Sequence, residues 1–193
     1  MFWKSGIKQV VVGLGNPGAY YGGTRHNLGF QVVDEMAKRQ GVKLGRKKFD
    51  GAYAKVILDG VTIALLKPLK FMNNSGVVVR EFTKYFGVEP KDVIIVQDDI
   101  TLELGFFKIK VGGSDGGHNG VKSVIDFLDD GGFIRIKCGV GAKKNKNMEL
   151  ADWVLTRFDA EEKGKIEAMM PRILECLECI IKEGVSQAMN KYN

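Results

Sequence analysis

Two hydrophobic patterns alternate along the chain and predict its secondary structure. Short runs rich in β-branched and aromatic residues, typical of strands, occupy 9–12, 52–58, 61–67, 93–96, 106–111 and 133–140. Apolar residues spaced three and four positions apart predict amphipathic helices over about 27–40, 75–86, 121–128 and 160–182. Because strand runs alternate with helical patterns, the sequence predicts an open α/β sheet.

Turn and breaker residues delimit these elements. Asp59–Gly60, between two strand runs, is the strongest short-range signal for a β-hairpin. Gly41 and Gly87 should end the first two helices, and Pro171 predicts a kink or a restart in the last one. The basic segment 43–48 is predicted to be a solvated loop.

Length and composition favour one domain spanning 1–193. A chain of 193 residues that is 45% hydrophobic can bury its own core, and it shows no repeat or low-complexity linker. Its apolar runs are shorter than a membrane span, and 1–6 lack the apolar region of a signal peptide, so we expect no membrane association and a cytoplasmic location. Cys176 and Cys179 on the last predicted helix are expected to be buried thiols rather than zinc ligands.

The charge distribution points toward an anionic partner. The formal net charge is +6, which favours polyanions. Basic residues gather around the second histidine, and they are Lys108, Lys110, Lys122, Arg135, Lys137, Lys143, Lys144 and Lys146. A solvated face and a phosphate track beside an active site both account for this cluster.

The chain is organised around the glycine-rich stretch 13–27, which follows the first strand run. His26 lies where this stretch meets a helix, near the carboxyl end of a strand, where open α/β sheets bind ligands. Gly13, Gly15 and Gly18 also match the dinucleotide-binding fingerprint, which needs a helix that opens on the glycines. Further glycines at 22 and 23 disfavour such a helix, so a nicotinamide cofactor is the weaker hypothesis.

Other polar residues follow strands or precede helices. Asn73 lies in the break before the second helix, where a helix cap and a functional role are equally open. Asp98 directly follows the buried strand run 93–96, where a turn cap is the alternative. His118 and Asn119 lie in the glycine-rich segment 112–120, which lacks the apolar neighbours of a core histidine, so a functional role is favoured for His118.

These residue types favour hydrolysis by directly activated water. The sequence has no serine or cysteine in a nucleophile elbow, and its two histidines and scattered carboxylates lack metal-ligand spacing. A neutral imidazole can accept a proton from water near neutral pH, a carboxylate can fix its tautomer, and amides can donate to an oxyanion. This chemistry suits an activated ester better than a stable amide.

Five ordered motifs resemble those of bacterial-type peptidyl-tRNA hydrolases. They are Val-Gly-Leu-Gly-Asn-Pro-Gly at 12–18, Thr-Arg-His-Asn at 24–27, Phe-Met-Asn-x-Ser-Gly at 71–76, Asp-Asp at 98–99 and Gly-Gly-His-Asn-Gly at 116–120. The resemblance continues through 139–141, 151–155 and 188–190. It implies a single α/β domain with a twisted mixed, mostly parallel central sheet flanked by helices. It also implies a monomer that needs no metal or other cofactor and hydrolyses the ester between peptide and tRNA, which releases the tRNA.

The resemblance further implies individual roles. His26 would be the general base, Asp98 its orienting partner, and Asn73 the residue that positions water or polarises the ester carbonyl. The peptide and the terminal nucleotide would contact Asn16, Tyr21, Met72, His118 and Asn119. The tRNA phosphates would contact Lys108, Lys110 and Lys137.

The sequence departs from the family pattern at positions that bear on RNA affinity. Lys137 stands where an arginine is usual, Gln97 replaces a frequent histidine, 101–104 replace a more proline-rich loop, and Asp115 adds a negative charge. A non-catalytic RNA-binding relative is the main alternative function. The presence of His26, Asn73 and Asp98 together favours catalysis.

Overall fold

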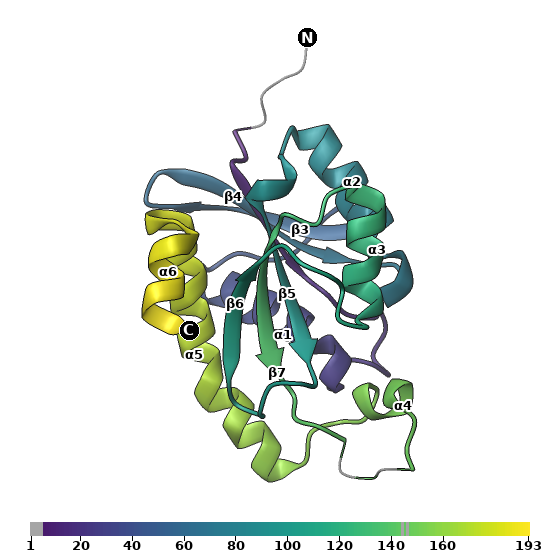
Figure 1. The fold of residues 1–193 in the computed structure, drawn as a ribbon. Coiled ribbons are helices and arrows are strands. Elements are labelled where there is room, and N and C mark those ends of the chain that lie inside the picture. Colours follow the sequence, from purple (N-terminus) through teal and green to yellow (C-terminus); the bar gives the residue numbers. More distant parts are fainter. Residues whose placement is uncertain (1–5, 144, 146) are drawn as a thin grey trace.

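The computed structural model of the protein describes residues 6–143, 145 and 147–193. In this part of the chain, seven strands form one sheet in the order β2-β3-β4-β1-β5-β7-β6 (Figure 1). Their bounds are Gln9–Gly13 (β1), Arg46–Lys48 (β2), Gly51–Leu58 (β3), Val61–Pro68 (β4), Val93–Asp99 (β5), Phe107–Val111 (β6) and Ile134–Gly139 (β7).

Strand directions place several chain ends together. The central strands β4, β1, β5 and β7 are mutually parallel, whereas the pairs β2–β3, β3–β4 and β6–β7 are antiparallel. This arrangement confirms the prediction of a mixed sheet that is mostly parallel. The carboxyl ends of β1, β5 and β7 therefore meet at one edge of the sheet, which is the ligand-binding edge in such folds.

Helices cover both faces of the sheet (Figure 1). Helices α1 (Leu28–Arg39), α5 (Ala160–Glu183) and α6 (Val185–Tyr192) pack on one face, around a core that includes Val11 and Ile94. Helices α2 (Ser75–Phe86) and α3 (Asn119–Leu128) pack on the other, around Val10 and Ile95. The short helix α4 (Leu150–Val154) lies beyond the carboxyl ends of β5 and β7. Among the described residues, every helix is too short or too polar to cross a membrane.

Three turns of 3-10 helix complete the chain and carry candidate residues. They are η1 (Arg25–Asn27), which contains His26, η2 (Met72–Asn74), which contains Asn73, and η3 (Pro90–Asp92). Gly13 and Gly29 allow the start of α1, which directly follows η1, to lie very close to the sheet. A Cβ atom at Gly13 would lie 2.2 Å from the carbonyl oxygen of Gly29, and one at Gly29 would lie 2.4 Å from that of Val96. Helix α1 therefore packs directly on β1 and β5, which brings the preceding His26 to the end of β5.

Most predicted boundaries are confirmed. The predicted helix over 75–86 is α2, which ends at Gly87 with a φ of 70°, and Asp59–Gly60 joins β3 to β4. One prediction is wrong, and one of two alternatives in another is excluded. Arg46–Lys48, inside the predicted loop, forms the edge strand β2, because pairing with β3 overrides its polar composition. No restart occurs at Pro171, since α5 continues through this residue. Helix α6 was not predicted.

Candidate active site

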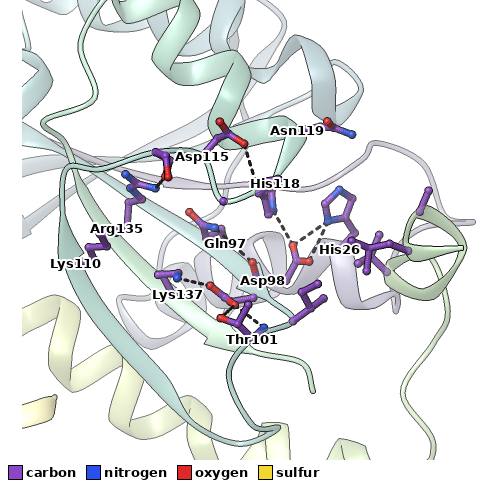
Figure 2. Close-up of a pocket in the computed structure, with 18 residues that line it drawn as sticks. His26, Gln97, Asp98, Thr101, Lys110, Asp115, His118, Asn119, Arg135 and Lys137 are labelled. Atoms are coloured by element: carbon purple, nitrogen blue, oxygen red, sulfur yellow. Dashed lines mark hydrogen bonds and ion pairs between the residues drawn. The ribbon is translucent and has the colours of Figure 1, made fainter. Parts of the chain in front are cut away.

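One buried carboxylate lies between both histidines of the chain. Asp98, at the end of β5, is 3% exposed. Its Oδ1 and Oδ2 lie 2.9 and 3.1 Å from Nδ1 of His26, and its Oδ1 lies 3.0 Å from Nε2 of His118 (Figure 2). The three side chains come from β5, η1 and the N-terminus of α3, so the fold assembles this group from distant segments.

Hydrogen-bond partners assign the tautomers of both rings. Nδ1 of His118 accepts the backbone N–H groups of Gly120 (3.2 Å) and Val121 (3.3 Å), so His118 caps α3. The ring proton of His118 is therefore on Nε2, where it is donated to Asp98. Asp98 likewise accepts Nδ1–H of His26. The lone pair of neutral His26 is then on Nε2, on the far side of the ring from the carboxylate, as a general base requires.

Asp98 stays ionised in this setting. Burial alone would raise the pKa of Asp98, but electrostatic attraction and a hydrogen bond from His118, followed by a hydrogen bond and electrostatic attraction from His26, outweigh it. The pKa of Asp98 is therefore held well below the usual carboxyl range. An ionised Asp98 can stabilise the imidazolium that forms when His26 accepts a proton.

A pocket of about 220 Å³ opens beside this group (Figure 2). His26, Asp98, His118 and Asn119 line it, together with the basic residues Lys110, Arg135 and Lys137. Leu150, Ala151 and Val154 of α4 form an apolar wall of the same pocket. The predicted general base and two of the three predicted phosphate contacts therefore share one pocket with the second histidine.

The remaining predicted substrate contacts form a neighbouring cluster. Oδ1 of Asn16 accepts the backbone N–H of Met72 (2.8 Å), which links β1 to η2 and leaves the Asn16 amide hydrogens for other acceptors. The ring of Tyr21 meets Phe71 edge-on at 6.2 Å between centroids. Asn16 lines a second pocket, of about 240 Å³, rather than the pocket beside His26.

Asn27 fixes the backbone of Asn16 and had no role in the sequence-based prediction. Its Oδ1 accepts the N–H of Asn16, and its Nδ2 donates to the carbonyl of Asn16, both at 2.9 Å. The adjacency of Asn27 to His26 in the Thr-Arg-His-Asn motif was the available signal, but the contact itself depends on the fold.

Asn73 and Asn119 both present exposed side chains near this region. Asn73 is the middle residue of η2, and Asn119 is the first residue of α3. The two elements approach closely at Gly120, where an added Cβ atom would lie 2.4 Å from Sδ of Met72 and 3.2 Å from Cε1 of His118. Glycine at this position therefore allows the Met72 and His118 segments to pack together.

The register of β6 and β7 places four cations on one face of the sheet. Lys108 pairs with Lys137, and Lys110 pairs with Arg135, and side chains that are directly paired lie on the same face. Lys108 and Lys110 are exposed. The predicted basic cluster is thus partly present, while Lys144 and Lys146 lie outside the described residues.

Two of these four cations have internal partners. Nζ of Lys137 lies 2.5 Å from Oδ2 of Asp99. The other carboxylate oxygen of Asp99, Oδ1, accepts hydrogen bonds from the N–H and the hydroxyl of Thr101. Arg135 is 2% exposed and donates to the carbonyl oxygens of Gly112, Gly113 and Ser114. The prediction of an exposed basic cluster is therefore wrong for Arg135, because its guanidinium holds the glycine-rich loop instead.

The fold brings together three possible metal ligands that are widely spaced in the sequence. His26, Asp98 and His118 offer ligand atoms that all lie within 4.8 Å of one another, so the fold gathers what the sequence scatters. A metal on Nε2 of His118 would require the ring proton on Nδ1, where it would face the N–H groups of Gly120 and Val121. The hydrogen bonds that cap α3 therefore oppose metal binding by this ring.

The dinucleotide reading of the first glycines fails on geometry. That motif requires a helix that begins on the glycines and faces the pyrophosphate. Here Gly18 has a φ of 104°, residues 18–24 form turns and a bridge, and α1 begins at Leu28.

The chain is similar to peptidyl-tRNA hydrolases both in sequence and in structure. The family model described as peptidyl-tRNA hydrolase matches residues 10–193. The peptidyl-tRNA hydrolase of Lachnospira eligens is 44% identical over 184 residues, which covers 95% of this chain and 98% of that protein. That of Clostridium acetobutylicum is 40% identical over 184 residues, with 95% and 97% covered. The crystal structure of the Acinetobacter baumannii peptidyl-tRNA hydrolase superimposes with a TM-score of 0.90 at 32% identity, covering 99% of this chain and 96% of that one.

The sheet topology and the relatives named above define an α/β enzyme, and a hydrogen-bonded histidine–aspartate pair lies at the carboxyl edge of its sheet. A purine nucleoside phosphorylase from Toxoplasma gondii shares the fold alone, with a TM-score of 0.54 at 11% identity. The chain belongs to the peptidyl-tRNA hydrolase family, as the matched model and the relatives over nearly its whole length show.

Proposed function

We propose that the protein hydrolyses the ester bond between peptide and tRNA in peptidyl-tRNA, with His26 as the general base, without a metal and without a covalent intermediate. The bidentate contact of Asp98 with Nδ1 of His26, at 2.9 and 3.1 Å, carries the proposal. It assigns the lone pair to Nε2, in a residue that lines the pocket.

The reaction needs two proton transfers at one nitrogen. Nε2 of His26 accepts a proton from water, and the water oxygen forms a bond to the ester carbonyl carbon, which gives a tetrahedral oxyanion. Asp98 stabilises the imidazolium, and the amide of Asn73 donates to the oxyanion or holds the water. When the carbon–oxygen bond to the ribose breaks, the proton on Nε2 passes to the leaving oxygen. The products are a peptide with a free carboxylate and a tRNA with a free terminal hydroxyl.

The substrate would contact both the pocket beside His26 and the neighbouring cluster around Asn16. The Asn16 amide, the exposed Asn119 and the Met72 segment would bind the peptide and the terminal nucleotide, with Tyr21 at the rim. His118 would act at the floor of the cleft, through its bond to Asp98. Amide side chains suit this role because they pair with backbone groups of any peptide sequence.

The cations on β6 and β7 would bind tRNA phosphates. Lys108 and Lys110 are exposed on one face of the sheet, and Lys137 lies beside them. Phosphate contacts of this kind position the acceptor end without reading its sequence. We infer further that residues 1–193 act as one domain, as a monomer in the cytoplasm and without a membrane or an obligate protein partner.

Substrate discrimination tests the proposal. Wild-type protein should release tRNA from N-acetyl-aminoacyl-tRNA, leave aminoacyl-tRNA with a free amino group intact, and retain its rate after treatment with a chelator. Rates are measured by acid precipitation of labelled substrate. Tight tRNA binding without cleavage would refute the hydrolase and identify a non-catalytic RNA-binding relative instead.

Replacing Asp99 by asparagine should strengthen tRNA binding. Asp99 holds Lys137 at 2.5 Å, so the carboxylate competes with phosphate for that ammonium group. Without it, one more cation is available, and the slope of log K against log salt should steepen by about 0.7–0.9. Deacylated tRNA is titrated by fluorescence anisotropy at several salt concentrations. Glu89→Gln, which breaks the exposed pair with Lys91, is the matched control, and an unchanged slope in Asp99→Asn would contradict the role of Lys137.

A further inference from the structure

Arg25, which precedes the general base in the chain, has a completely internal set of contacts. Its side chain is 2% exposed, although it belongs to the same short helix η1 as His26. Nη2 donates to Oε2 of Glu162 at 2.6 Å. Nη1 donates to the hydroxyl of Thr156 at 3.0 Å and to the carbonyl of Arg157 at 2.7 Å. These contacts use the guanidinium as a planar fork, a geometry that lysine does not provide.

Aromatic rings enclose the same guanidinium. Its Cζ lies 3.9 Å from the ring centroid of Trp153 and 4.8 Å from that of Phe158. Both rings are buried, so the cation–π attraction acts away from water, where it is strongest. Every partner of Arg25 named so far lies between residues 153 and 162, a segment that runs from the end of α4 through the connecting loop into the first turn of α5.

Glu162 ties this connection to the start of α5. Its Oε2 accepts the N–H of Asp159 at 3.0 Å, while Oδ1 of Asp159 accepts the N–H of Glu162 at 2.9 Å, which forms a capping box. Backbone contacts add to the attachment, since the N–H of Arg25 donates to the carbonyl of Thr156 and Thr24 forms a bridge with Arg157. The carboxylate that begins α5 therefore also holds η1.

The contacts of Arg25 also affect the pocket, because Trp153, one of its partners, belongs to α4. Trp153 stacks on Arg25, and its indole N–H donates to the carbonyl of Gly141 at 3.2 Å. Its helix neighbours Leu150, Ala151 and Val154 form the apolar wall of the pocket that His26 also lines. Arg25 thus joins the segment that carries the base to the segment that forms the wall of the pocket.

We propose that Arg25 is a positioning residue, which holds the α4 wall at a fixed place relative to His26 through Glu162, Trp153 and Phe158. The proposal rests on the proposed hydrolysis of peptidyl-tRNA. His26 and this wall line the same pocket, so displacement of α4 would change the shape of the space in which the reacting carbon is bound. A misplacement of about 1 Å suffices to lower a rate by about 10²-fold. Phosphate contacts on β6 and β7 do not depend on this unit.

The experiment combines kinetics with the fluorescence of Trp153. The chain has two tryptophans, Trp3 and Trp153, so a Trp3→Phe background isolates Trp153. In that background, Glu162→Gln and Arg25→Lys should each lower kcat/KM for N-acetyl-aminoacyl-tRNA by about 10–10²-fold. Acrylamide quenching of Trp153 should increase, because Arg25→Lys removes the guanidinium that covers its ring and Glu162→Gln removes the charge that anchors this guanidinium. The Kd for deacylated tRNA should stay at the wild-type value, which a general folding defect would not permit.

The control is Arg39→Lys, which alters another Arg–Glu pair that reaches α5. Nε of Arg39 lies 3.1 Å from Oε1 of Glu178, at side chains that are 39% and 18% exposed. This variant should keep wild-type kinetics and quenching. Wild-type kcat/KM in a folded Glu162→Gln or Arg25→Lys protein would overturn the proposal, and so would a loss of activity without increased quenching. Absence of cleavage by the wild type would refute the hydrolase itself, while Trp153 quenching would still report whether Arg25 holds α4.

Discussion

Replacing His26 by alanine is expected to lower kcat/KM for N-acetyl-aminoacyl-tRNA by about 10²–10⁴-fold. Alanine removes the imidazole whose lone pair is placed on Nε2 by the hydrogen bond from Nδ1–H to Asp98. Hydroxide and the remaining amide contacts would then support a slow residual reaction. Single-turnover hydrolysis, with enzyme in excess over substrate, measures the loss without interference from product release.

Two comparisons make this result specific to proton transfer. Deacylated tRNA should bind His26→Ala with wild-type affinity, because the lysines on β6 and β7 are unaffected. His118→Asn offers a matched change of the second histidine, since asparagine is also a good N-cap for α3. Its loss of activity should be smaller, because it removes one hydrogen bond to Asp98 and not the base. Wild-type kcat/KM in a folded His26→Ala protein would exclude His26 as the base.

The fold was largely predictable because its local signals agree with its tertiary structure. Helix α2 combines an apolar face, a polar start and Gly87 in the left-handed region, so each rule gives the same boundary. Strand β2 was missed because Arg46 and Lys47 carry no apolar pattern, and only pairing with β3 makes them a strand. Of the two outcomes predicted at Pro171, the restart does not occur, because the helix tolerates one missing hydrogen bond and continues through this residue.

That the candidate residues His26, Asp98 and His118 lie close together was predictable, whereas their individual contacts were less so. Turn chemistry and strand ends identified His26, Asp98 and His118, since the carboxyl ends of parallel strands meet at one edge. That His118 donates to Asp98 while it caps α3 could not be read from spacing, because only the fold brings the start of α3 to the end of β5. The carboxylates therefore looked scattered in the sequence, whereas in the fold the carboxylate of Asp98 is shared by the rings of His26 and His118.

The burial and the ion pair of Arg25 were the features that the sequence indicated least. An arginine between a threonine and a histidine in a loop suggests an exposed cation, yet it is among the most deeply buried side chains. Its ion-pair partner Glu162 lies 137 positions later in the chain. Nothing local to either residue indicates the pairing, and Glu162 alone predicts only a capping box at α5.

Replacing Asp98 by asparagine is expected to lower kcat/KM by up to about 10⁴-fold, although the shape of the side chain is preserved. Asp98 accepts hydrogen bonds through both of its oxygens, whereas asparagine keeps one accepting oxygen and replaces the other with an NH2 group that donates. An amide N–H directed at Nδ1 of His26 would favour the tautomer with the proton on Nε2, which cannot accept a proton from water. The imidazolium would also lose its adjacent negative charge.

The same variant should change how stability depends on pH. Because the pKa of Asp98 is held below the ordinary carboxyl value, its ion pairs and hydrogen bonds stabilise the folded state fully above about pH 4. This contribution is lost as the pH falls from there toward the folded-state pKa. Thermal unfolding followed by circular dichroism between pH 7 and pH 3 should therefore show a steeper acid decrease of Tm in the wild type than in Asp98→Asn. The exposed Asp126→Asn variant on α3 should follow the wild type. Parallel wild-type and Asp98→Asn curves, or activity in Asp98→Asn close to that of the wild type, would show that the carboxylate charge does not control the two histidines.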